Sequence, residues 1–81
     1  MDLKDTIELM SSSDYKDRFK AEYYQTKIRY EKLHTMIVKY EAGTLGFEPD
    51  CPIELLRAQK KNMSEYLYHL EVRAQIEKID L

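Results

Sequence analysis

The sequence predicts an all-α protein in which a short N-terminal helix is followed by a long antiparallel helical hairpin. In two long stretches, large apolar and aromatic residues recur at alternating steps of three and four residues. Such spacing places side chains on one face of an α-helix. Only 2 Gly and 2 Pro occur among 81 residues, and none of them lies within residues 13–42. This composition disfavours sheet-rich and low-complexity folds.

Residues 2–10 predict the short helix, with Leu3, Ile7 and Met10 on one face. A helix of this length is not stable alone, so we expect that face to dock on the rest of the chain. Three consecutive serines at 11–13 then interrupt the pattern. Serine favours helix caps over helix interiors, which makes Ser13 the expected N-cap of the next helix.

The central helix is predicted over residues 13–42, and the rest of the chain is organised around it. Its stripe contains Phe19, Tyr23, Thr26, Tyr30, Leu33, Ile37 and Tyr40. At about 1.5 Å per residue, this helix would be roughly 45 Å long and would need a partner along most of its length. Gly43 suits the left-handed position that follows a helix C-terminus.

Residues 43–51 form the predicted connection and residues 52–78 the third helix. Asp50 or Cys51 is the expected cap, and Pro52 is tolerated in the first turn. The third helix carries a stripe of Leu56, Gln59, Met63, Leu67, Leu70 and Ala74. Two helices of similar length joined by a short loop pack antiparallel, with Leu45 and Phe47 folding over the loop. Residues 1–81 therefore form one helical domain.

The third helix carries more apolar surface than one hairpin seam uses. Opposite its main stripe lie Tyr68, Val72, Ile76 and Ile79. The simplest cover for these residues is a second copy of the chain, so we expect a homo-oligomer with this face in the interface. The alternative is that the short first helix covers the second face within the monomer.

Composition excludes several classes of function. A net charge of -2 argues against a duplex nucleic acid binder, and a single cysteine excludes an internal disulfide and a cysteine-based zinc site within one chain. No apolar run approaches the ~20 residues that span a membrane. Glu31 and His34 have the Glu-x-x-His spacing of di-iron bundles, but Leu33 takes the core-facing position between them. We find no acid–base or nucleophile constellation, and expect no enzyme, no cofactor and no metal.

One flank of the central helix combines lysines with aromatic rings. Its members are Lys16, Lys20, Tyr23, Lys27 and His34, and Tyr24 borders it. Lysines bind anions and rings offer a stacking surface, which is the combination that a nucleotide requires. The alternative is that lysine stems pack beside a hydrophobic seam and the tyrosines fill a bundle. On the third helix, Tyr66 and Arg73 share a flank whose composition is typical of an interface hot spot.

The third helix contains the pattern Gln59-x-x-x-Met63-x-x-Tyr66-Leu67-x-x-Leu70-x-x-Arg73. It follows a helix that includes Tyr15-Lys16-Asp17-Arg18 and Tyr30-Glu31-Lys32-Leu33. Over residues 14–77 the chain resembles a family of small helical-hairpin proteins of tailed phages and prophages, including crAss-like phages. Its architecture is also similar to that of phage sponges that bind cyclic-nucleotide immune signals. The resemblance implies a phage or mobile-element origin and a place of action in the host bacterial cytoplasm.

The leading hypothesis is a non-enzymatic phage-type binding protein that counters a bacterial defence system. It would either block a host defence protein or sequester a nucleotide signal. For the second mechanism the expected binding residues are Lys16, Lys20, Tyr23, Tyr24 and Lys27, with Tyr66 and Arg73 contributing across a subunit interface. The structural alternative is an adaptor or assembly protein that acts through helix–helix contacts without a small-molecule ligand.

Overall fold

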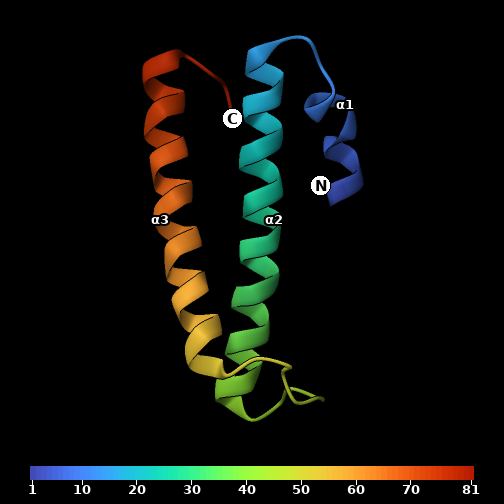
Figure 1. The fold of residues 1–81 in the computed structure, drawn as a ribbon, viewed down its shortest axis with the longest axis vertical. Helices are drawn as coiled ribbons and strands as arrows, with labels where there is room; N and C mark the ends of the chain where they lie inside the picture. The colour runs from blue at the N-terminus through green and yellow to red at the C-terminus, as the bar shows by residue number, and fades with distance from the viewer.

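The computed structural model describes residues 1–81 and confirms the all-α fold (Figure 1). A 3₁₀ turn, η1 (Leu3–Thr6), leads into a single α-helical turn, α1 (Ile7–Met10). The two long helices are α2 (Tyr15–Ala42) and α3 (Ile53–Glu77). They run antiparallel in a body of 43 × 24 × 17 Å. No helix is both long and apolar enough to cross a membrane.

The N-terminal segment docks on α2 through a different face from the one that the sequence predicts. Leu3 and Leu9 are half-buried and Thr6 is fully buried, whereas Ile7 and Met10 are exposed. The reason is that η1 has about three residues per turn, which aligns residues 3, 6 and 9. The Thr6 hydroxyl donates to the carbonyl of Leu3 at 2.7 Å and accepts from Nε2 of Gln25 at 2.8 Å.

Side-chain and backbone caps define both ends of α2. Asp14, not the expected Ser13, is the N-cap, and its Oδ1 accepts from the backbone N–H of Lys16 at 3.0 Å. At the other end Gly43 has φ 75°, as predicted. The N–H of Thr44 then bonds to the carbonyl of Lys39 at 2.9 Å, which completes a Schellman motif.

The same motif ends α3, although no glycine is present. Lys78 adopts the left-handed conformation with φ 59°, and the N–H of Ile79 bonds to the carbonyl of Ala74 at 2.8 Å. This turn sends the C-terminal tail back toward α2 (Figure 1). At its start, α3 is preceded by Pro52 as N-cap rather than by Asp50 or Cys51.

The buried core lies at one end of the hairpin, which we call the terminal end because both chain termini are near it. Its members are Phe19, Tyr23, Leu67, Leu70, Ala74 and Ile79. The opposite end, called the loop end, contains the second half of α2 and the first half of α3. Ile37 is buried there but is not part of the cluster. Phe47 is 59% exposed, so the expectation that it folds over the hairpin loop is wrong.

An apolar stripe on α3 remains uncovered. Tyr68, Val72 and Ile76, here called the α3 stripe, are 63%, 39% and 74% exposed. The short first helix does not cover them, because α1 contacts α2 and not α3 (Figure 1). Ile79 was predicted to lie in the same interface. The structure corrects this, since Ile79 is 5% exposed and packs in the core of its own chain.

Candidate functional site

The basic-aromatic flank of α2 is built into the terminal end of the hairpin. Tyr23 is buried, and its hydroxyl donates to Oε2 of Glu71 on α3 at 2.6 Å. Burial and then this hydrogen bond raise the pKa of Tyr23 to about 12. The Tyr24 ring packs edge-on against Tyr23, with centroids 5.4 Å apart, and the Lys27 ammonium lies 5.7 Å from the Tyr23 centroid. The Tyr23 ring and hydroxyl therefore already have partners within the chain.

The two outer lysines of the flank do not converge on a cavity. Lys16 donates from Nζ to the carbonyl of Lys78 at 3.4 Å, and Lys20 is half-buried. A cavity of about 260 Å³ beside Tyr23 and Lys27 also includes Glu31 and Glu71 in its lining. Two carboxylates next to one lysine oppose the binding of an anion. The contacts that the chain itself supplies to this flank are packing contacts and hydrogen bonds.

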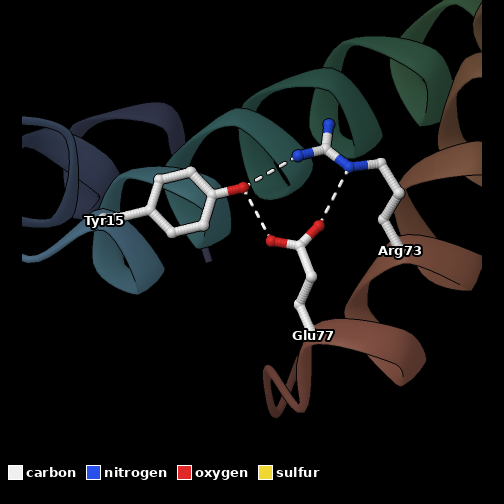
Figure 2. A network of polar contacts seen from close by, with 3 residues as sticks. All are labelled: Tyr15, Arg73 and Glu77. Carbon is white, nitrogen blue, oxygen red and sulfur yellow. Dashed lines mark hydrogen bonds and ion pairs between the residues drawn. The ribbon is translucent and has the colours of Figure 1, made fainter.

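Arg73 belongs to a polar network that joins α2 to α3 (Figure 2). Its Nη2 donates to the Tyr15 hydroxyl at 2.8 Å, and its Nε donates to Oε2 of Glu77 at 3.1 Å. The Tyr15 hydroxyl donates in turn to Oε1 of Glu77 at 2.8 Å, which closes a triangle. The Arg73 guanidinium also lies 5.0 Å from the Phe19 ring centroid.

The charges of this triangle stabilise one another. The hydrogen bond from Tyr15 lowers the pKa of Glu77, and the bond to Glu77 raises the pKa of Arg73. Tyr66, the other residue predicted on this flank, is 42% exposed and takes no part in the triangle. Because Nε and Nη2 of Arg73 already have partners at the terminal end, we do not place it in a ligand pocket of the monomer.

A groove of about 890 Å³ lies at the loop end, between α2 and α3. Its lining comprises Tyr30, Ile37, Val38, Glu41, Ala42, Arg57, Lys60, Lys61, Ser64 and Glu65. The wall from α2 is mostly apolar, and Val38 is half-exposed along it. The wall from α3 is polar and carries three cations and the carboxylate of Glu65. We call this cavity the α2–α3 groove.

Only one of the three cations in the groove has a carboxylate partner. Arg57 donates from Nε to Oε1 of Glu41 at 2.9 Å, and its Nη2 bonds the same oxygen. This ion pair joins α2 to α3 at the groove, and the hydrogen bond to Glu41 raises the pKa of Arg57. Neither Lys60 nor Lys61 forms an ion pair. The groove therefore offers free positive charge opposite an aromatic and apolar wall.

Sequence reasoning did not find this groove. Arg57, Lys60 and Lys61 follow helical spacing, but so do most exposed cations on the two helices. The one available signal was the weak apolar pattern of the loop end, where Gln59 interrupts the row of predicted core residues on α3. In the structure Gln59 is exposed.

A family model matches most of the chain. It is described as Sequestin, and it covers residues 13–76. The chain belongs to the Sequestin family. The Sequestin match spans α2 and nearly all of α3, and so contains every residue that lines the groove. The segment formed by η1 and α1 lies outside it. No curated protein and no solved structure matches the chain.

Proposed function

We propose that this chain is a non-enzymatic binding protein that sequesters a nucleotide signal in the α2–α3 groove. The family name supports the first half of the proposal, because Sequestin denotes sequestering. The groove supports the second half. Its volume of about 890 Å³ falls in the range of small-molecule sites, roughly 300–1,000 Å³.

The chemistry of the two walls fits the two parts of a nucleotide. Tyr30, Ile37 and Val38 provide an aromatic and apolar surface against which a base can pack. Arg57, Lys60 and Lys61 face them with charges that suit phosphate oxygens. The observation that carries the proposal is this pairing of an apolar wall and a cationic wall across one cavity.

We propose further that the protein acts against a bacterial defence system, in a phage context. The sequence resemblance to phage helical hairpins and to the architecture of nucleotide sponges supports this role. A protein that binds a signal stoichiometrically requires no catalytic residues.

Native mass spectrometry of the protein recovered from a bacterial lysate tests the function directly. We expect a retained mass of a few hundred daltons per site, which is the size of a nucleotide. The double variant Lys60→Glu/Lys61→Glu is expected to lose this mass. Its matched control is Lys4→Glu/Lys32→Glu, which makes the same change in charge at exposed positions outside the groove. Equal retention by both variants would contradict the assignment of the groove.

The α3 stripe supports an oligomer, which remains part of the proposal. Its three residues lie on the outer face of α3, and the groove residues Lys61 and Glu65 continue the same helical face. A second copy seated on Tyr68, Val72 and Ile76 would thus lie along the edge of the groove. Val72→Asp is expected to convert the oligomer to a monomer with unchanged helix content. Sedimentation velocity and circular dichroism measure the two properties.

The α3 stripe also favours a second candidate function, in which it docks on a host defence protein or an assembly partner. That function needs no ligand in the groove. It predicts a monomer without retained mass in the native spectrum, and loss of partner capture in Val72→Asp but not in Lys60→Glu/Lys61→Glu.

A further inference from the structure

We propose that Glu41 is an internal competitor for the ligand phosphate, and that the phosphate replaces its carboxylate on Arg57. The inference rests on the proposed function. It identifies Arg57 as the residue that binds the phosphate. It also predicts that the groove binds phosphorylated nucleotides in preference to nucleosides.

The ion pair between Glu41 and Arg57 spans the two helices. Glu41 lies in the last turn of α2, and Arg57 lies in the second turn of α3, so their ion pair crosses the groove near its loop end. Two guanidinium nitrogens, Nε and Nη2, converge on the single oxygen Oε1. This is the edge of arginine that binds two oxygens of a phosphate in parallel. Glu41 therefore occupies the position that a phosphate would take.

Solvent weakens the ion pair between Glu41 and Arg57. The Arg57 and Glu41 side chains are 44% and 53% exposed, so water screens their attraction. No other side chain donates to the Glu41 carboxylate. A phosphate carries more charge than a carboxylate and can bond both guanidinium nitrogens with separate oxygens. Replacement of the Glu41 carboxylate on Arg57 is consequently favourable for a phosphate. A neutral nucleoside has no anionic group that could replace it.

Glu41 has an unfavourable position in its helix. A carboxylate in the last turn lies at the negative end of the helix dipole, where it destabilises the helix. Glu41 thus gives no benefit to α2, and its one polar interaction is with Arg57. Lys60 and Lys61 are free to stabilise the phosphate after the exchange, whereas Glu41 can turn toward solvent because it is exposed.

An NMR titration with inorganic pyrophosphate tests the exchange, with the side-chain Nε–H resonance of Arg57 as the reporter. In Glu41→Gln the concentration for half-saturation is expected to fall by about 2- to 5-fold, the range that exposed ion pairs support. Arg57→Gln is expected to weaken pyrophosphate binding, as reported by backbone resonances at Lys60 and Lys61. Adding Glu41→Gln to Arg57→Gln should then have no further effect.

Glu8→Gln is the matched control, because it removes the same charge from an exposed position on α1. If Glu41→Gln and Glu8→Gln shift the half-saturation equally, the role of Glu41 is overturned and general charge explains the change. If no variant responds to pyrophosphate, this inference fails. The retained mass in the native spectrum decides the proposed function separately. A parallel titration with ADP and adenosine should show the Glu41→Gln gain for ADP alone.

Discussion

The two ends of the hairpin are built from the same pair of helices but differ in how those helices contact each other. At the terminal end, six buried residues, the Tyr23–Glu71 hydrogen bond and the Tyr15–Arg73–Glu77 triangle hold α2 against α3. At the loop end, both helices line the groove and an exposed ion pair joins them. Packing at one end leaves the other free to carry unpaired lysines beside an apolar wall. Stability and binding are thus separated along one hairpin.

Core truncation should give the largest contrast between the ends. Leu70→Ala removes a side chain that is 1% exposed at the terminal end, and we expect a loss of about 2–5 kcal/mol in the free energy of unfolding. Ile37→Ala should cost less, because Ile37 borders the groove and lies outside the core cluster. Urea denaturation followed by circular dichroism measures both. Equal losses would show that the loop end is packed as well as the terminal end.

Ile37→Ala has a second expected effect that Leu70→Ala does not share. It shortens the apolar wall of the groove, so the mass retained in the native spectrum should fall while the fold persists. A folded Leu70→Ala protein should keep its ligand. Retention by Ile37→Ala would argue that bases do not pack on that wall.

Removal of the Tyr23 hydroxyl should have an intermediate effect. Tyr23→Phe loses the hydrogen bond to Glu71, and we expect it to cost about 0.5–1.5 kcal/mol near neutral pH. The pKa of Tyr23 is raised to about 12, so the folded state favours the neutral phenol. This contribution is complete below the ordinary tyrosine pKa of 10 and is lost as the pH rises from about 10 to 12. Unfolding measured across that range should show a steeper fall for the wild type than for Tyr23→Phe.

The smallest change is expected at the exposed triangle. Hydrogen bonding lowers the pKa of Glu77, so its contribution to stability is present above the ordinary carboxyl pKa and is lost as the pH falls through the lowered value. Glu77→Gln should therefore be slightly less stable than the wild type at neutral pH and equally stable in acid. Thermal unfolding at several pH values measures the difference. Glu48→Gln, which changes a carboxylate in the loop, is the control. If both variants change thermal stability equally, the triangle does not stabilise the terminal end.

Helical periodicity was sufficient to predict the all-α fold, the hairpin and the role of Gly43. It failed for the N-terminal segment, because a 3₁₀ turn has a different period and selects Leu3, Thr6 and Leu9. It also failed for Ile79. A lysine occupies the left-handed position at 78, so the usual glycine signal for a Schellman motif was missing.

The groove could not be predicted from the sequence, for a different reason. Periodicity tells which face of a helix meets its partner, but not where along the contact the surface is hollowed. The cations of the groove were therefore indistinguishable from solvated lysines and arginines elsewhere. The residues predicted instead, such as Tyr23 and Arg73, have the right chemistry for a ligand but are engaged in joining α2 to α3.

The left-handed turn at Lys78 has a practical consequence for anyone shortening or extending the protein. Helix boundaries alone suggest that a cut after Glu77 removes only a disordered-looking end. Such a cut would in fact delete Ile79, leave a hole beside Ala74 and Tyr23, and strip α3 of its last backbone cap. Affinity tags and fluorophores attached beyond Leu81 would begin next to this anchored residue, so they need a spacer, whereas the exposed Met1 offers a freer point of attachment.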